Sequence, residues 1–421
     1  MTEIRVADVT CLGCGCGCDD IAVTVRDGRI IDTSPPCPVS RSWFGDGSVP
    51  WAVLRDGQPA TIEDAIRDAA DLLRAAAGRV LVYIGPDLSS QAQRNAVMLS
   101  DLLHGTADTS TSNTAAGGIL AAQRRGRATA TLGEIRNRGD VLLFWGVDPA
   151  QGYPRFHARY APDPVGTQVA KGRAGRLVIS VRIGADKGPP DADLTLAIEP
   201  KEEIAALSLM RAAASDRLPT EVAAPLRTAV DVVAHLTRAR YAVLIHDAEP
   251  GAEPRHPLRV EGLIALTQAL NAGTRAALLS LRAGGNRAGA ESVLTWQTGF
   301  PFAVDHSRGS PRYTPDNRGL ERLARGAFRA ALIVGAPSFR PETVSALQSI
   351  DTVIIGPGAT QADFAARVAI DTGVAGIHEG GTAYRMDDVP LPLRPPLTGQ
   401  RPTNQTLESL AEMIRRGGRS L

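Results

Sequence analysis

The sequence predicts an α/β protein built on parallel sheets, preceded by a small N-terminal β module. From residue 61 to residue 356, short apolar runs typical of buried strands alternate with longer amphipathic segments typical of helices. This alternation favours parallel strands joined by helices. The first 50 residues differ, because they alternate apolar and polar side chains with a period of two and contain all five cysteines.

The N-terminal module is expected to contain a hairpin, and the rest of the chain a series of α/β units. The run at 21–33 contains Asp27-Gly28, a strong turn signal between strands. The expected elements are strands over 3–9 and within 21–33, a helix over 61–77, a strand over 80–84, a helix over 89–104, a strand over 141–145, and further helices and strands at 176–183, 202–214, 222–239, 241–246, 260–271, 276–280, 331–335, 341–349 and 352–356.

Composition excludes several classes of partner. The 421 residues are 43% hydrophobic, enough for a large core and two to four domains. Lys and Arg number 46 against 45 Asp and Glu, so no electrostatic footprint for nucleic acid or an anionic membrane is expected. No window offers eighteen uncharged apolar residues, and the N-terminus has no apolar signal region. A cytoplasmic protein is expected.

The clustered cysteines predict a metal site. A Gly-rich turn with the spacing C-x2-C-x3-C is followed, after eighteen intervening residues, by a fourth thiol. Four convergent thiolates can hold a 4Fe–4S cluster or a tetrahedral zinc, and a vestigial, metal-free knuckle is the alternative. The intervening glycines permit a sharp backbone path and let amide N–H groups approach sulfur. The predicted ligands are Cys11, Cys14, Cys18 and Cys37, with Cys16 left as the odd thiol.

Four sequence blocks resemble the B subunit of the formylmethanofuran dehydrogenase family, within the molybdopterin oxidoreductases. The blocks occur in the family's order and span nearly the whole chain. They are CLGCGCGCDD at 11–20, FWGVDP at 144–149 continuing to 160, GGNRAGAE at 284–291 with TWQTGFP at 295–301, and IHEGGTAYRMD at 377–387.

The resemblance implies a molybdopterin-oxidoreductase-like fold with Rossmann-like parallel sheets. The chain is too short for the C-terminal β-barrel domain that closes over the pterin, so a separate subunit is expected to supply it. The expected domains are a Cys-cluster β module at 1–50, the first part of an α/β domain at 51–160, a Rossmann-like domain at 161–290, and a return to the first α/β domain with a C-terminal tail at 291–421.

The chain departs from the enzymes at the position of their metal-ligating cysteine or selenocysteine. Thr114 stands there, and a neutral hydroxyl is a poor ligand for a soft metal. No cysteine beyond Cys37 can replace it; only Ser112 and Asp108 are near enough in sequence to substitute as oxygen ligands. Tungstopterin or molybdopterin is therefore expected to be absent, and no catalytic residue is predicted.

The Gly-rich block supplies the candidates for a vestigial pterin region. The resemblance assigns this role to Asn286, Gly289, Glu291 and Thr298. Apart from the resemblance, a Gly-rich turn after a strand is mostly a loop. The bulk of Arg287 is hypothesised to fill an empty cofactor channel.

The function implied is that of a scaffold. The chain is expected to be the non-catalytic B subunit of a formyltransferase/hydrolase complex in tetrahydromethanopterin- and methanofuran-linked oxidation of formaldehyde to formate. The implied partners are three other subunits, which are hydrolase-like, β-helical and formyltransferase, together with a methanofuran-type carrier. Two alternatives stay open: a catalytic tungsten or molybdenum subunit that interconverts carbon dioxide and formate, and an iron–sulfur electron-transfer module.

Overall fold

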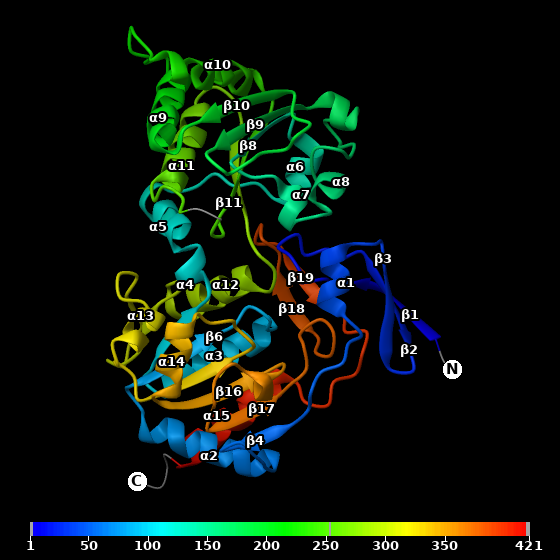
Figure 1. Ribbon diagram of the computed structural model, residues 1–421, viewed down its shortest axis with the longest axis vertical. Coiled ribbons are helices and arrows are strands. Elements are labelled where there is room, and N and C mark those ends of the chain that lie inside the picture. The colour runs from blue at the N-terminus through cyan, green and yellow to red at the C-terminus, as the bar shows by residue number, and fades with distance from the viewer. Residues whose placement is uncertain (1–2, 252–253, 418–421) are drawn as a thin grey trace. The chain divides into compact units, whose positions relative to one another are not determined.

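The computed structural model describes residues 3–251 and 254–417, whose contacts divide into two compact units (Figure 1). The first unit takes the described residues up to Gly13, then Gly17–Asn113, and those from Gly284 onward. The second takes Cys14–Cys16 and Thr114–Ala283. The predicted domains at 1–50, 51–160, 161–290 and 291–421 stay predictions beside this division.

The N-terminal module is a three-stranded antiparallel sheet in the order β1-β2-β3. Its strands are β1 (Glu3–Val9), β2 (Ile21–Arg26) and β3 (Arg29–Ser34). Asp27 and Gly28 form the turn between β2 and β3, both with positive φ, at 49° and 76°. A two-residue turn of this kind matches the twist of the flanking strands, so the predicted hairpin is confirmed.

A nine-stranded sheet forms the centre of the first unit. Its middle is parallel, in the order β7-β6-β15-β16-β17, and antiparallel strands flank it at both edges. In spatial order the strands are β14 (Arg312–Tyr313), β13 (Val304–Asp305), β7 (Thr106–Thr109), β6 (Val80–Ile84), β15 (Ala330–Val334), β16 (Asp351–Gly356), β17 (Val368–Asp371), β4 (Val53–Arg55) and β5 (Gln58–Pro59).

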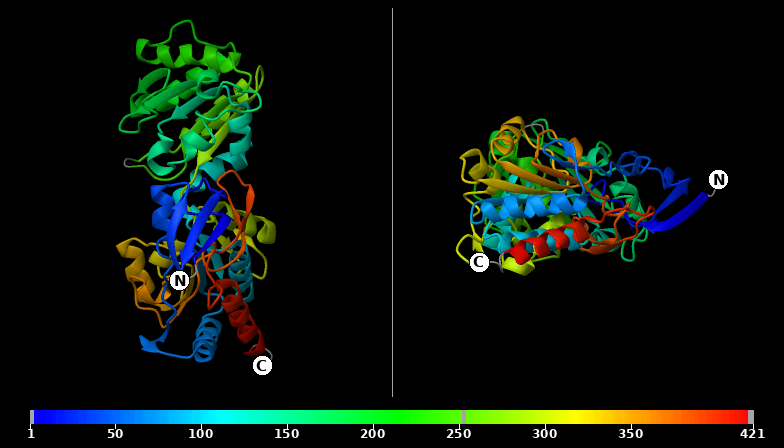
Figure 2. Two further views of the ribbon diagram at one scale, coloured as in Figure 1. Left: turned by 90° about the vertical axis from the view of Figure 1, so that its right-hand side faces the viewer. Right: turned by 90° about the horizontal axis from the view of Figure 1, so that it is seen from below.

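Helices cover both faces of this sheet because its strands are apolar on both sides. Val80 and Val82 of β6 share a core with three helices on one face and also with α12 (Arg287–Thr298), whereas Leu81 and Tyr83 pack with two shorter helices on the other. Figure 2 shows two of the first group, α2 and α15, side by side. The first group is α2 (Ile62–Ala75), α3 (Ser90–Leu102) and α15 (Thr403–Gly417), and the second is α13 (Gly319–Ala324) and α14 (Pro341–Gln348).

Shorter elements complete the first unit. They are the helices α1 (Pro38–Phe44), α4 (Thr111–Thr114) and α12 (Arg287–Thr298), the 3₁₀ turn η3 (Ala359–Gln361), and the strand pair β18 (Gly381–Tyr384) and β19 (Pro390–Leu393). The helix α4 ends where the second unit begins.

The second unit is built on a five-stranded sheet that is parallel throughout. Its order is β10 (Leu194–Ile198), β9 (Leu177–Ile183), β8 (Val141–Trp145), β11 (Ala242–Asp247) and β12 (Ala276–Leu281). All five residues of β8 are buried. The sheet places these strands in one core although Val141, the first residue of β8, and Ala276, the first residue of β12, are far apart in the sequence.

Four helices pack on one face of this second sheet. Their apolar residues share a core cluster with alternate residues of the strands, including Leu143 and Leu244. They are α5 (Ala116–Arg125), α9 (Glu203–Ala214), α10 (Ala224–Arg238) and α11 (Arg259–Leu270). The other elements are α6 (Leu132–Arg138), α7 (Pro149–Gly152), α8 (Phe156–Arg159), η1 (Gly172–Gly175) and η2 (Pro200–Glu202).

The predicted class, a mixed α/β protein with parallel sheets, is confirmed. Every helix and strand expected between residues 61 and 356 is present, with ends within about two residues. Among the elements that the sequence did not predict are β7, β10, β17, α6, α12 and α15. No helix within the described ranges is both long and apolar enough to cross a membrane.

Candidate functional site

The topology of the second unit marks one position for a ligand. From β8 the chain moves to β9 and β10 on one side, whereas β11 lies on the other side of β8 and leads to β12. In open α/β sheets, ligands bind outside the carboxyl ends of the two strands where the order reverses. In this unit those ends are the residues after Trp145 and around Asp247.

A cavity of about 410 Å³ lies at this position. This is a size typical of small-molecule sites. One side of the cavity comes from Thr114 and the start of α5, where Gly117 and Gly118 carry no side chain, and the other from the loop after β11. That loop contributes Asp247, Glu249, Arg255, His256 and Arg259.

The positive charge in the cavity wall is already balanced. Arg259 is 5% exposed, and its guanidinium donates to Glu203 and, at 2.9 Å, to Asp186. The indole N–H of Trp145 also donates to Glu203, at 2.8 Å. Arg255 donates to the same Asp186 at 3.3 Å. These arginines therefore hold the wall together and are not a ready pair of donors for an anionic ligand.

Tyr153 and Asp247 join the ends of β8 and β11. The phenol donates a hydrogen bond to Asp247 Oδ1 at 3.3 Å. Burial is the main cause that raises the pKa of both groups, and the nearby carboxylates raise that of Tyr153 further. Tyr153 therefore remains a protonated donor at neutral pH.

The two residues proposed as substitute metal ligands lie in the first unit. Asp108 Oδ1 accepts the backbone N–H groups of Thr109 and Ala303, and Oδ2 accepts that of Gly319. Burial raises the pKa of this carboxyl to about 6 in spite of these bonds. Ser112 is buried as well, and its carbonyl oxygen accepts from Arg318. Asp108 thus ties together three backbone segments.

The predicted pterin-region residues lie at α12 and have partners inside the first unit. The amide of Asn286 donates to Leu88 O, Ser90 Oγ and Gln93 Oε1, and Asn286 Oδ1 accepts from Tyr384 N. This fully buried side chain connects the start of α12 to the segment 88–93 and to β18.

The other pterin-region residues are similarly engaged. A Cβ at Gly289 would meet Asn286 Oδ1 at 2.0 Å, so glycine is required there. Glu291 accepts from Thr111 at 2.6 Å. Thr298 donates back to Leu294 O within its own helix. The structure gives all of these residues local partners, and their role toward a cofactor stays a prediction.

Arg287 is directed into its own unit. Its guanidinium donates to Gly284 O at 3.1 Å and to Ser110 Oγ at 2.8 Å. The side chain is half-buried, and its contacts connect the Gly-rich turn to the segment before α4. Whether it fills a cofactor channel stays a hypothesis.

The cysteines of the knuckle are divided between the two units. In the first, Cys11 N–H donates to Cys18 O at 2.8 Å, and the Gly13 amide approaches Cys11 Sγ at 3.4 Å. The predicted approach of an amide to sulfur is therefore present. Cys37 precedes α1 as its N-cap residue.

Cys14 and Cys16 belong to the second unit, where Cys14 bridges to Ala283. A hydrogen bond from Cys16 is the main cause that lowers the pKa of the Cys14 thiol. Tyr160 donates to Cys16 O at 3.3 Å. Within the described residues, no three His, Cys, Asp or Glu side chains are grouped as a metal site. The predicted metal ligands stay a prediction.

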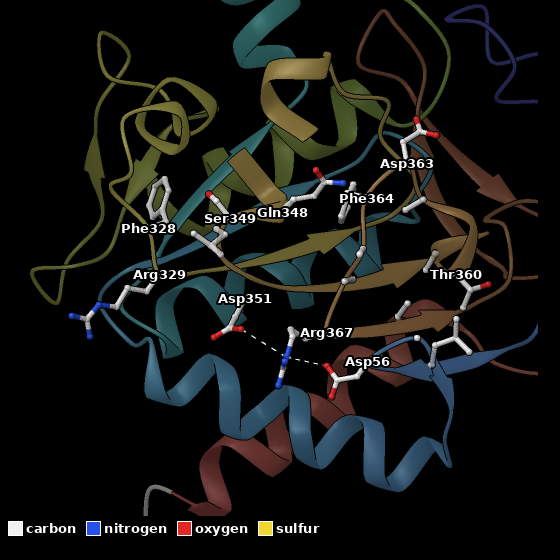
Figure 3. Close-up of a pocket in the computed structure, with 18 residues that line it drawn as sticks. Asp56, Phe328, Arg329, Gln348, Ser349, Asp351, Thr360, Asp363, Phe364 and Arg367 are labelled. Atoms are coloured by element: carbon white, nitrogen blue, oxygen red, sulfur yellow. Dashed lines mark ion pairs between the residues drawn. The ribbon is translucent and has the colours of Figure 1, made fainter. Parts of the chain in front are cut away.

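A second, wider cavity of about 960 Å³ lies over the first unit's sheet (Figure 3). It exists because the segment 357–367 between β16 and β17 contains only η3, whereas α14 covers the preceding crossover. Both apolar residues such as Phe364 and polar residues such as Gln348 line it. Arg367 reaches between Asp56 and Asp351, at 3.1 and 3.9 Å. These three charged residues are exposed at the rim.

Sequence reasoning did not find the buried charges of the first cavity. Glu203, Asp186 and Arg259 are far apart in the chain, and only the fold brings them together. One signal was available for Asp247, because a charged residue directly after a buried strand lies at the carboxyl edge of the sheet.

Comparisons with known proteins give the family. No family model matches the chain. It is 30% identical to the B subunit of the tungsten-containing formylmethanofuran dehydrogenase 2 of Methanocaldococcus jannaschii, over 97% of this chain and 98% of that protein. The corresponding protein of Methanococcus maripaludis is also 30% identical, over 92% and 93%.

A second kind of relative is the B subunit of the formyltransferase/hydrolase complex Fhc of Methylorubrum extorquens, 28% identical over 78% of this chain and 86% of that protein. The crystal structure of that organism's FhcABCD complex with methylofuran contains a similar chain. The TM-score is 0.72 at 25% identity, covering 87% of this chain and 99% of that one. This chain belongs to the family of formylmethanofuran dehydrogenase B subunits.

Proposed function

We propose that this chain is the non-catalytic B subunit of a formyltransferase/hydrolase complex, in which it holds the other subunits together. The complex would serve the tetrahydromethanopterin- and methanofuran-linked oxidation of formaldehyde to formate. Thr114 is the observation that carries the proposal. By the sequence resemblance it stands at the position of the family's metal-ligating residue, and it lines the cavity at the switch point of the second sheet.

The side chains around Thr114 do not fit a soft metal. Tungsten or molybdenum in this family takes a thiolate or selenolate, which supplies charge and polarisability that a hydroxyl lacks. The chain has no cysteine after Cys37 to take that place. The nearby Asp186 and Glu203 are engaged by Arg255 and Arg259, so these carboxylates support the cavity wall.

The partners follow from the same proposal. The similar solved chain belongs to an FhcABCD complex with methylofuran. By this likeness, the chain would assemble with three other subunits, which are hydrolase-like, β-helical and formyltransferase, and the complex would act on a methanofuran-type carrier. Its predicted cytoplasmic location is part of the proposal.

A second candidate function is the catalytic tungsten or molybdenum subunit of a formylmethanofuran dehydrogenase. One observation favours it: the two relatives with 30% identity are both named as subunits of tungsten-containing enzymes, and one match covers 97% of this chain. In that case Thr114 or a neighbouring oxygen would have to replace the thiolate.

Metal and pterin analysis of the whole complex distinguishes these functions. The chain is co-expressed with its three partner subunits, purified without oxygen, and analysed for tungsten, molybdenum and pterin. Formyl transfer and hydrolysis without any of the three are expected. Stoichiometric tungsten or molybdenum together with pterin would establish the dehydrogenase instead. A Thr114→Cys variant, with Thr195→Cys on an exposed strand position as its control, is expected to leave assembly and activity unchanged.

The same preparation tests the N-terminal cysteines. We propose that Cys11, Cys14, Cys18 and Cys37 hold a 4Fe–4S cluster or zinc, which is supported by their spacing and by the amide contact to Cys11 Sγ. Iron with acid-labile sulfide, or zinc alone, is expected at one site per chain. Loss of that metal in Cys18→Ser, but not in Cys16→Ser, would agree with the predicted ligand set.

A further inference from the structure

The N-terminal strand β1 is exposed on both faces and along one edge. Of residues Glu3 to Asp8, only Val6 is even half-buried. Within the described chain β1 pairs with β2 alone, so the other edge presents backbone N–H and C=O groups that no described strand uses. An open edge of this kind is a template for pairing with another chain.

An apolar row of side chains ends at this edge. Ile4 lies opposite Val25, and Val25 lies opposite Ile30, so the three share one face of the sheet. Val25 and Ile30 are buried, whereas Ile4 is 55% exposed. Ile4 also lines a cavity of about 720 Å³, whose other lining residues include Trp51. The row therefore stops at an isoleucine that still has room for an apolar neighbour.

Two opposite charges flank Ile4 on the other face of the strand. Glu3 is paired with Arg26 of β2, at 2.7 Å. Arg5 takes part in none of the ion pairs between described residues, and it is exposed. Three consecutive residues of this edge strand are thus negatively charged, apolar and positively charged.

We propose that a second copy of this chain pairs its β1 antiparallel with β1, with Ile4 opposite Ile4. A two-fold axis then passes between the two isoleucines, and each Glu3 lies opposite Arg5 of the other copy. The result is one six-stranded sheet with a continuous apolar row and two new ion pairs. Such a self-complementary contact is the usual form of a two-fold interface.

The charges select this register. A shift that brings Arg5 opposite Arg5 places like charges directly across the strands, which is unfavourable. In the Ile4-centred register, Glu3 lies between Arg26 of its own chain and Arg5 of the other copy. This self-association is independent of the proposed role in a formyltransferase/hydrolase complex, since it uses neither the cavity at Thr114 nor the cysteines.

Charge reversal tests the register by analytical ultracentrifugation of the full chain. Wild type is expected to dimerise. Arg5→Glu alone and Glu3→Arg alone each place like charges across the interface and are expected to raise the dimer dissociation constant roughly tenfold. Mixing the two variants restores both opposite pairs, so the mixed dimer is expected to form at wild-type strength. A mixture as weak as its components would overturn the register.

Ile4→Asp, with Ile31→Asp as a matched control, tests the edge itself. Ile31 is 47% exposed and lies on β3, at the opposite edge of the same sheet. Ile4→Asp is expected to give monomers, and Ile31→Asp to remain dimeric. A monomeric wild type, or dimers unaffected by Ile4→Asp, would refute the pairing. If the wild-type chain is monomeric and Ile4→Asp instead prevents binding of the co-expressed subunits, the edge belongs to one of them and the self-pairing is refuted.

Discussion

In the first unit β6 and β15 are neighbouring strands, and the chain continues from them to opposite sides, from β6 to β7 and from β15 to β16. In the second unit the same holds for β8 and β11. The first switch point is closed by the chain itself: both carboxylate oxygens of Asp87 accept the N–H of Ala336, each at 3.0 Å. A cavity lined by Ala336 and Pro337 measures about 160 Å³. The second switch point keeps a cavity of about 410 Å³.

The difference has a local cause. Gly85 and Gly335 follow β6 and β15, and a Cβ on either would contact Asp87 at 2.9 or 2.5 Å. Their lack of side chains lets the Asp87 carboxylate enter the crevice. In the second unit the corresponding charges, Arg259 and Glu203, pair with each other in the wall and leave the crevice open. The two units thus share this topology, but the crevice at the switch point is filled in the first unit and open in the second.

The largest expected effect is on the charge network of the open crevice. Arg259→Met leaves Glu203 and Asp186 without this guanidinium, and removal of one partner from a buried ion pair costs about 3–5 kcal/mol. Hydrogen exchange of the β8 and β11 amides measures this loss in the second unit. Arg240→Met is the control, because its pair with Asp140 is 67% exposed on the arginine side. Equal protection in both variants would contradict the role of the network.

The sequence predicted the strands and helices well because their periodicity is local. Two of the elements that it missed are a polar buried strand and a helix that follows a Gly-rich turn. Strand β7 reads TADT and is fully buried, which is possible because the Asp108 carboxylate accepts the N–H of Thr109 within the strand and those of Ala303 and Gly319 from other segments. Helix α12 follows GGN, a sequence typical of a loop.

The site was predictable only in part. The resemblance predicted that position 114 matters, and the structure places Thr114 in the cavity wall. The network of Glu203, Asp186 and Arg259 joins residues 56 and 73 positions apart, and no local pattern indicates such pairs. The filling of the first crevice by Asp87 depends on the same kind of long-range contact, with Ala336.

The next largest effect is a pH dependence of the second unit. His246 is buried at the end of β11, and burial lowers its pKa to about 3. The unfolded state takes up a proton near the ordinary value of 6.5, so stability is complete above that pH and is lost as the pH falls toward 3. The loss between pH 7 and pH 4 is about 3 kcal/mol.

Urea unfolding across this range, followed for the second unit, measures the slope. His246→Gln retains a partner for Ser280 Oγ but does not titrate, so its stability is expected to change less with pH than that of wild type. The exposed His256→Gln is the matched control and should retain the wild-type slope. Parallel slopes for all three proteins would rule out the buried, neutral imidazole as the cause.

A smaller effect is expected at the closed crevice. Gly335 has φ of 89°, and a Cβ there would press on Asp87 Oδ1. Gly335→Ala is expected to destabilise the first unit by about 2–3 kcal/mol, from backbone strain and displacement of the carboxylate together. Gly326→Ala is the control and measures the contribution of backbone strain alone. Gly326 also has a positive φ, 71°, but nothing lies within 4 Å of its Cβ position. A Gly335→Ala loss no larger than that of the control would show that Asp87 does not fill the crevice tightly.

The smallest effect has the opposite sign and belongs to the open crevice. Gly117 lies in the first turn of α5, lines the cavity at Thr114, and has nothing within 4 Å of its Cβ position. Gly117→Ala is therefore expected to stabilise the second unit by about 0.5–1 kcal/mol, because alanine favours the helix and meets no obstacle. Hydrogen exchange of the α5 amides measures the gain. A destabilised α5 would mean that the crevice is closed around Gly117, and the contrast between the two switch points would then fail.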